Sequence, residues 1–137
     1  MHKKYNGIRK GFTLVELLVV IVILSLLAGI VAPKLYAQID KAKWDLTKPK
    51  MRDIETVINT YLLNCGDFPS SLDNLLNNSG IDGWSGPYLK EDQIIDPWGF
   101  EYVYVIPGTI HPESYDLISY GKDGVPGGDG YYAEQYN

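Results

Sequence analysis

The architecture of this chain follows from one stretch, FTLVELLVVIVILSLLAGIVA at residues 12–32. These 21 residues contain a single ionisable side chain, that of Glu16. As an α-helix rising about 1.5 Å per residue, they would extend for about 31 Å, which matches the roughly 30 Å thickness of the hydrocarbon core of a bilayer. The sequence therefore predicts one membrane-spanning helix near the N-terminus.

The eleven residues before this stretch are basic and contain no acidic residue. Their charged residues are Lys3, Lys4, Arg9 and Lys10. The positive-inside rule places such a segment in the cytoplasm and everything after Pro33 on the other side of the membrane. A conventional signal peptide or a plain membrane anchor would share this pattern. However, proline directly follows Ala32 and makes a poor cleavage site, so we expect the apolar stretch to be retained.

Glu16 lies near the start of the apolar stretch, with no basic residue inside that stretch. An unpaired carboxylate costs on the order of 2.5 to 3.5 kcal/mol at the centre of a membrane helix, and less near its end. If the chain were cut between Gly11 and Phe12, the new α-amino group of Phe12 would lie four residues from Glu16. An adjacent copy could present that amino group to the carboxylate. We therefore predict that Glu16 acts in assembly and sets the axial register between copies.

The motif KGFTLVEL at residues 10–17 resembles the class III leader junction of type IV pilins and type II secretion pseudopilins. The resemblance implies that a prepilin peptidase cuts between Gly11 and Phe12 and that Phe12 is then N-methylated. It also implies that the apolar helix stays in place as anchor and filament core. The expected divisions are a cleaved leader peptide at 1–11, a transmembrane and filament-core helix at 12–33, and a globular domain at 34–137.

Further helix is expected beyond the membrane. Gly29 and Pro33 predict a kink or a loosened turn near residues 29–33, and the sequence leaves open whether Pro49 bends the helix, divides it or begins a new one. Gly66 is expected to end the helix. Apolar residues at helical spacing predict a face that packs on a sheet. These residues are Ile54, Val57, Ile58, Tyr61 and Leu62.

From Trp84 onward the sequence is typical of short strands separated by glycine and proline. The runs are GPYL at 86–89, YVYVI at 102–106 and YDLISY at 115–120, while DPWG at 96–99 predicts a tight turn with a buried tryptophan. About three short strands after a long helix predict an α+β domain, in which the helix covers one face of a small antiparallel sheet. The tail, residues 131–136, is expected either to pack on the domain or to fray.

The order of these motifs, ending in YDLISYGKDG at 115–124, resembles the major pseudopilin of type II secretion systems over nearly the whole chain. The resemblance implies a type IV pilin-like fold and a homo-oligomeric helical filament, a periplasmic fibre that drives export of folded proteins across the outer membrane. The implied partners are minor pseudopilins, the prepilin peptidase, an inner-membrane assembly platform with its ATPase, and an outer-membrane secretin. The implied location is the inner membrane, crossed once, with the C-terminal domain in the periplasm.

An ordinary type IV pilin or a competence pseudopilin, acting in adhesion, motility or DNA uptake, is the alternative interpretation. Type IV pilins usually close their C-terminal region with a disulfide loop, which the single Cys65 cannot form. The cysteine count therefore favours a pseudopilin, and we assign Cys65 no role.

The loop DGVPGGD at residues 123–129 places two carboxylates on a glycine-rich backbone. Calcium takes six to eight oxygen ligands and accepts backbone carbonyls beside carboxylates. The spacing matches no EF-hand, and taken alone it is better interpreted as a solvated turn. Major pseudopilins carry calcium in the corresponding loop, so the resemblance implies Asp123 and Asp129 as ligands, with the carbonyls of Tyr120 and Val125 and, as a further candidate, Ser119. The chain departs from the family in having one acidic residue near position 129, which affects the expected ligand set.

Composition argues against other functions. From Asp53 onward, fourteen acidic residues oppose only two basic ones, a balance that repels nucleic acid. One cysteine and two histidines are too few for a zinc or thiolate cluster. No Walker motif or nucleophile elbow is present, so an enzyme is not expected. The remote alternative is a membrane-anchored hydrolase that uses a carboxylate pair such as Asp92 and Asp96.

Overall fold

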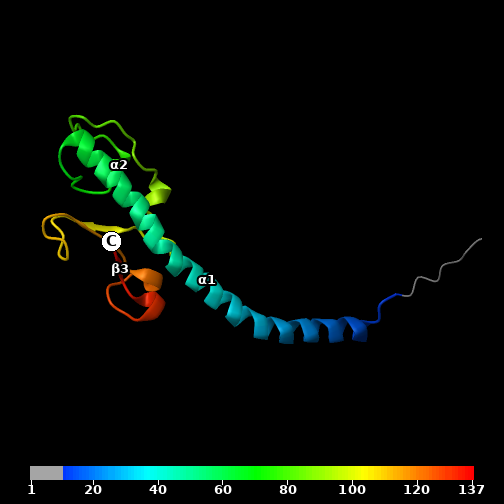
Figure 1. Cartoon of the computed structure of the whole chain (residues 1–137). Coiled ribbons are helices and arrows are strands. Elements are labelled where there is room, and N and C mark those ends of the chain that lie inside the picture. The colour runs from blue at the N-terminus through cyan, green and yellow to red at the C-terminus, as the bar shows by residue number, and fades with distance from the viewer. Residues whose placement is uncertain (1–10) are drawn as a thin grey trace, which may run out of the picture. The chain divides into compact units, whose positions relative to one another are not determined.

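The computed structural model describes residues 11–137 (Figure 1). The leader expected at 1–11 therefore lies outside the described residues, except for Gly11. The chain divides into two units, Met1–Ala37 and Gln38–Asn137. One continuous helix, α1 (Leu14–Cys65), belongs to both of them.

In the first unit, α1 is an apolar helix with its side chains exposed. It contains a segment long and apolar enough to cross a membrane, and none of that segment is buried within the structure. We expected a kink or a loosened turn near residues 29–33. The helix is continuous there, and the kink stays a prediction. It also continues through Pro49, so this proline neither divides the helix nor begins a new one. A proline removes one donor from the hydrogen-bond ladder, and the neighbouring turns keep theirs.

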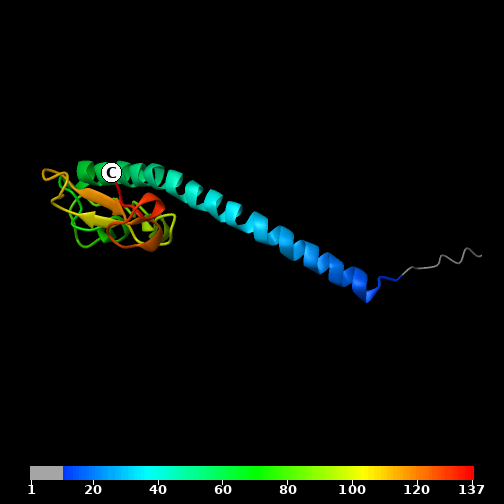
Figure 2. The same ribbon diagram turned by 90° about the horizontal axis from the view of Figure 1, so that it is seen from below.

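The second unit contains a three-stranded antiparallel sheet beside the last part of α1 (Figures 1 and 2). Its strands are β1 (Val103–Val105), β2 (Asp116–Ser119) and β3 (Gln135–Tyr136), in the order β1-β2-β3. Tyr104 pairs with Leu117, and Ser119 pairs with Gln135. The predicted α+β class is confirmed, and the tail packs as strand β3 instead of fraying.

Short helices connect these elements. They are the α-helix α2 (Asp73–Leu76) and the 3₁₀-helices η1 (Glu91–Ile94), η2 (Gly121–Asp123) and η3 (Gly130–Tyr132). The run at 86–89 is not a strand, which differs from its β-like texture in the sequence. At 96–99 the expected tight turn is present, because the Gly99 N–H donates to the Asp96 carbonyl at 3.1 Å. Trp98 in this turn is half-buried.

The core lies between α1 and the sheet. Ile54, Ile58 and Tyr61 of the predicted stripe are buried, and they pack in one cluster with Tyr102 and Leu117 from the β region. Fully burying an apolar side chain of this size contributes about 1.5 to 3 kcal/mol, so this face of α1 stabilises the domain. The helix ends as predicted, because Gly66 adopts a φ of 83° and its N–H closes onto the Leu62 carbonyl at 2.8 Å.

Candidate functional site

The predicted processing junction lies just before α1. Gly11 and Phe12 are exposed and non-helical, and the Phe12 side chain is 86% exposed. A peptidase needs an accessible backbone outside a helix, and these two residues are exposed and precede α1. The structure describes this segment with the leader still attached, so the α-amino group discussed above would arise only after cleavage.

Glu16 has a partner that our sequence reasoning missed. The Thr13 N–H donates to Glu16 Oε2 at 2.8 Å, and the Glu16 N–H donates to Thr13 Oγ1 at 3.2 Å. This reciprocal pair is a capping box, and its signature, a threonine followed three residues later by glutamate, was visible in the sequence. The carboxylate is thus held at the amino end of α1, where the helix dipole favours negative charge. Within the described residues no basic group lies within 4 Å of it, so its charge is not neutralised there.

The second candidate site is the loop that follows strand β2. Helix η2 ends at Gly124, whose φ of 68° lies in the left-handed region that favours glycine. A side chain at Gly124 would also place its Cβ 2.6 Å from the ring of Phe100. The Val125 N–H donates to Asp123 Oδ1 at 3.3 Å, and the Gly127 N–H donates to Glu134 Oε1 at 2.8 Å. These contacts give the loop a defined path.

Two of the predicted calcium ligands lie on the surface of this loop. Asp123 and Asp129 are exposed, and the carboxylate of Asp129 accepts no hydrogen bond from any residue between 11 and 137. Across the same residues, no group of three or more carboxylate, histidine or cysteine side chains could hold a metal. An ion here would thus need backbone carbonyls, such as those of Tyr120 and Val125, which calcium accepts and zinc does not usually use. The donor chemistry of the loop therefore fits calcium.

Ser119 has a different partner. It is buried, and its hydroxyl donates to Asp96 Oδ2 at 2.6 Å. The other oxygen, Asp96 Oδ1, accepts from the N–H groups of Trp98 and Phe100 at 2.9 Å each. Asp96 thus ties the turn at 96–99 to strand β2. Both of its oxygens are engaged in the fold, whereas Asp92, the other member of the carboxylate pair considered for a hydrolase, is exposed on η1.

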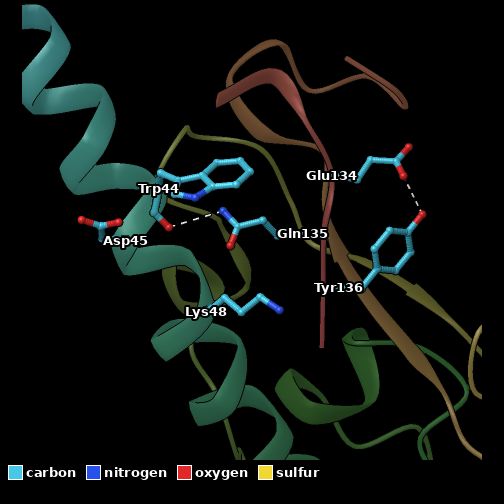
Figure 3. A pocket seen from close by; sticks show the side chains of 6 residues that line it. All are labelled: Trp44, Asp45, Lys48, Glu134, Gln135 and Tyr136. Atoms are coloured by element: carbon cyan, nitrogen blue, oxygen red, sulfur yellow. Dashed lines mark hydrogen bonds between the residues drawn. The ribbon is translucent and has the colours of Figure 1, made fainter. Parts of the chain in front are cut away.

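The C-terminal segment also contacts α1 within the second unit. Lys122 Nζ lies 2.6 Å from Asp40 Oδ2, and the Tyr131 ring meets the Trp44 ring edge to face at 6.0 Å between centroids. Figure 3 shows a third contact, in which Gln135 Nε2 donates to the Trp44 carbonyl at 3.3 Å. Sequence reasoning assigned no role to these residues. Together they fasten the loop after β2 to the part of α1 that lies just beyond the apolar segment.

These features define a class of protein: a membrane-anchored, pilin-like subunit with an apolar N-terminal helix, a capping glutamate at the helix start and a small α+β domain. Residues 34–137 match the family model described as "Type II secretion system (T2SS), protein G". Residues 8–32 match the model of the prokaryotic N-terminal methylation motif.

Similar proteins from several bacteria are named core protein G of the type II secretion system. The type II secretion system core protein G of Xanthomonas campestris is 37% identical over 122 residues, which cover 88% of this chain and 84% of that protein. The core protein G of Pseudomonas aeruginosa is 35% identical, over 88% of this chain and 88% of that protein. The core protein G of Vibrio cholerae is 32% identical, over 90% of this chain and 88% of that protein. The chain therefore belongs to the type II secretion system protein G family.

Proposed function

We propose that this chain is the major structural subunit of a type II secretion pseudopilus. Copies polymerise into a fibre, and growth of the fibre moves folded proteins through a channel in the outer membrane. Membership of the protein G family carries this proposal, and that family consists of structural subunits of the secretion system rather than enzymes. The exposed apolar part of α1 supports it, because such a helix is buried only by lipid or by other copies.

Membership of the same family supports a proposal for processing and location. The leader at 1–11 stays in the cytoplasm and is removed after Gly11, and Phe12 becomes the methylated first residue. The match to the N-terminal methylation motif over residues 8–32 supports this step. Residues 12–33 then cross the inner membrane once, and the domain at 34–137 lies in the periplasm.

Assembly depends on other components. The chain has no nucleotide-binding motif, so energy comes from a separate ATPase on an inner-membrane platform. A prepilin peptidase processes the chain, minor pseudopilins join the fibre, and a secretin forms the outer-membrane channel. Nucleic acid is not a partner, because the domain beyond α1 is strongly acidic.

Deletion of the gene tests the proposal. We expect secreted proteins to accumulate in the periplasm, because the fibre that moves them is missing, and we expect pili and DNA uptake to be unchanged. Fractionation of cells and medium measures the first effect, and expression of the full-length chain from a plasmid should restore secretion. Normal secretion together with lost pili or lost DNA uptake would instead identify a type IV pilin or a competence pseudopilin.

We also propose that calcium binds the loop after β2. The carboxylates of Asp123 and Asp129 hold the ion, the carbonyls of Tyr120 and Val125 complete its shell, and Ser119 contributes least because its hydroxyl is engaged by Asp96. A bound calcium neutralises the two carboxylates and holds the loop in one conformation. The contacts of this loop with α1 would then be held as well.

Calcium should raise the stability of the folded domain by mass action. A ligand at a hundred times its Kd stabilises the folded state by about 2.7 kcal/mol. We expect the melting temperature of the full-length protein in detergent to fall when a chelator replaces excess calcium, and we expect this difference to vanish in Asp123→Ala and Asp129→Ala. The matched control is Glu113→Ala, an exposed acidic residue on another loop, which should keep the full calcium response. Equal melting temperatures of the wild type in chelator and in calcium would refute the proposal.

A further inference from the structure

A groove lies between α1 and strand β3 in the second unit (Figure 3). Its volume is about 510 Å³, and strand β3 is the outer strand of the sheet. The lining residues are Trp44, Asp45, Lys48, Glu134, Gln135 and Tyr136. The groove is separate from the processing junction, and it adjoins the proposed calcium loop through Glu134, which accepts from the Gly127 N–H.

The two carboxylates of the groove have hydrogen-bond or ion-pair partners, whereas its lysine has no carboxylate partner among the described residues. Glu134 Oε2 accepts from the Tyr136 hydroxyl at 2.6 Å, and its other oxygen accepts from a backbone N–H. Asp45 is paired with Lys41 at 2.5 Å, and in Figure 3 its carboxylate points away from Gln135. Lys48 is exposed, and no carboxylate of the described residues lies within 4 Å of it. The groove therefore offers one unpaired positive charge to a ligand.

The positive charge continues along α1. Arg52 is four residues after Lys48, so it lies on the same side of the helix one turn further on. It too is exposed and has no carboxylate within 4 Å among residues 11–137. The buried side of this part of the helix is formed by Thr47, Met51 and Ile54, so the core does not use the side that carries Lys48 and Arg52.

Charge is divided unevenly along the chain. Residues 34–52 hold six basic residues and two acidic ones, whereas residues 53–137 hold fourteen acidic residues and two basic ones. Domains with such an excess of negative charge repel one another when they are packed side by side. A homopolymer of this chain must offset that repulsion.

We propose that Lys48, at the edge of the groove, and Arg52 bind acidic residues of a second copy of this chain. The inference rests on the proposed function, because it names a contact within the filament. A helical filament uses heterologous contacts, in which two different patches of one chain meet. The side of α1 that carries Lys48 and Arg52 and the acidic residues of 53–137 are such a pair. Each carboxylate that reaches Lys48 or Arg52 turns a repulsive approach into a charge-assisted hydrogen bond.

Anionic lipid is the competing ligand for a basic helix near a membrane. Lys48 comes sixteen residues after Ala32, and so about 24 Å of helix separates it from the end of the apolar stretch. The polar layer on each side of the hydrocarbon core is only about 5 to 7 Å thick. An acidic protein surface is thus the better match for Lys48 than a headgroup.

Crosslinking of wild-type filaments tests the contact directly. Filaments are grown from equal amounts of chain processed after Gly11, with natural and with heavy nitrogen. They are treated with a carbodiimide, which joins a lysine amine to a carboxylate that touches it. Mass spectrometry should then find Lys48 joined to an acidic residue of 53–137, with natural and heavy nitrogen mixed in the crosslinked pair. If intact filaments give Lys48 crosslinks only within one copy, or none at all, the inference is wrong and the proposed function is unaffected.

Charge reversal gives the second test. We expect Lys48→Glu to lower the fraction of chain in filaments about tenfold, because like charges then face each other. The matched control is Lys90→Glu, an equal charge change at another exposed lysine, and Lys48→Arg should assemble normally. An unchanged melting temperature of Lys48→Glu would show that it folds.

The outcomes separate the possibilities. Failure of the wild-type chain to form filaments would contradict the proposed function itself. Normal filaments from Lys48→Glu would overturn only the inference. Lys48→Glu could also form normal filaments and bind phosphatidylglycerol vesicles more weakly than the wild type does, with equal binding of the two to phosphatidylcholine vesicles. That result would assign Lys48 to lipid and would also overturn the inference.

Discussion

The Glu16→Gln variant is expected to enter the membrane normally and to form no filaments. Glutamine keeps an oxygen that can accept the Thr13 N–H, and it occurs at this position of capping boxes. The start of α1 should therefore remain intact. What the substitution removes is the negative charge, which the described residues do not neutralise and which we expect a neighbouring Phe12 amino group to meet.

The Glu16→Gln substitution should make membrane insertion easier and filament assembly harder. Loss of a carboxylate from the apolar segment lowers the cost of insertion, by at most about 2.5 to 3.5 kcal/mol and by less near the end of the helix. Loss of the same carboxylate leaves the neighbouring α-ammonium unpaired within the filament, where it would be poorly solvated. Membrane fractionation and electron microscopy of sheared filaments measure the two effects separately.

Two controls make the result interpretable. Ser25→Ala changes a polar residue in the same apolar segment, where the hydroxyl donates to the Ile21 carbonyl at 2.8 Å, and it should assemble normally. Mass spectrometry must find N-methylated Phe12 in the Glu16→Gln protein, because an uncleaved chain would also fail to assemble. Filaments of normal number and length from a processed Glu16→Gln chain would remove the assembly role of Glu16.

The long helix and the face it buries could be predicted from the sequence because both depend on local spacing. Ile54, Ile58 and Tyr61 repeat at helical intervals, and a strong apolar face of this kind requires a partner layer. The helix end at Gly66 follows from the conformational freedom of one residue. The effect of Pro49 on the helix could not be predicted, because whether a helix continues through a proline depends on the packing of the neighbouring turns.

The contacts between distant segments could not be predicted. Lys122 and Asp40 are 82 residues apart in the chain, and nothing in their local sequence distinguishes them from other exposed charges. Strand β3 has only two residues, which is too short for an alternation of polar and apolar side chains to appear. The capping box at Thr13 is different, because its signature, a threonine three residues before a glutamate, is local and is visible in the sequence.

The sequence locates the candidate calcium loop but does not give its full set of ligands. Two aspartates on a glycine-rich segment mark the place, whereas the carbonyls that would complete the shell depend on the path of the backbone. That path is set by Gly124 against Phe100 and by the hydrogen bond from Gly127 to Glu134. Ser119 could not be judged from the sequence either, because its partner Asp96 lies 23 residues away.

The largest loss of stability is expected from Asp116→Asn. Asp116 is buried at the start of strand β2, with its side chain 1% exposed. Its carboxylate accepts from the N–H groups of Thr109, Ile110 and His111 at 2.5, 2.8 and 3.0 Å, and His111 Nδ1 lies 2.9 Å from Oδ1. This one side chain therefore fixes the loop between β1 and β2.

An asparagine at position 116 can satisfy only part of this set, because its NH₂ group would face donors. Leaving buried donors without an acceptor costs about 1 to 3 kcal/mol, and bonds to a charged group contribute most. We expect a loss of about 2 to 3 kcal/mol in the free energy of unfolding, or roughly 10 to 20 °C in melting temperature for a domain of this size. Thermal and urea denaturation of the full-length protein in detergent measure it.

The pH dependence of stability should change in the same variant. Burial by itself raises the pKa of Asp116, but the hydrogen bonds from Ile110, the ring and backbone of His111, and Thr109 together outweigh it and lower the pKa below its usual value. A carboxylate with a lowered folded-state pKa adds stability above its unfolded pKa, near 3.9, and loses that contribution as the pH falls through the folded-state value. Asp116→Asn should therefore destabilise the domain fully at pH 7 and progressively less, relative to the wild type, below about pH 4.

Two variants separate the carboxylate from its surroundings. Glu113→Gln makes the corresponding acid-to-amide change at an exposed position three residues away and should leave the free energy of unfolding within about 0.5 kcal/mol of the wild type. His111→Ala removes only the ring contact and keeps the three backbone donors, so its effect should be about 1 kcal/mol. If Asp116→Asn were no more destabilising than His111→Ala, the backbone donors of the loop would have to be satisfied by water, and the carboxylate would not be what holds the loop against β2.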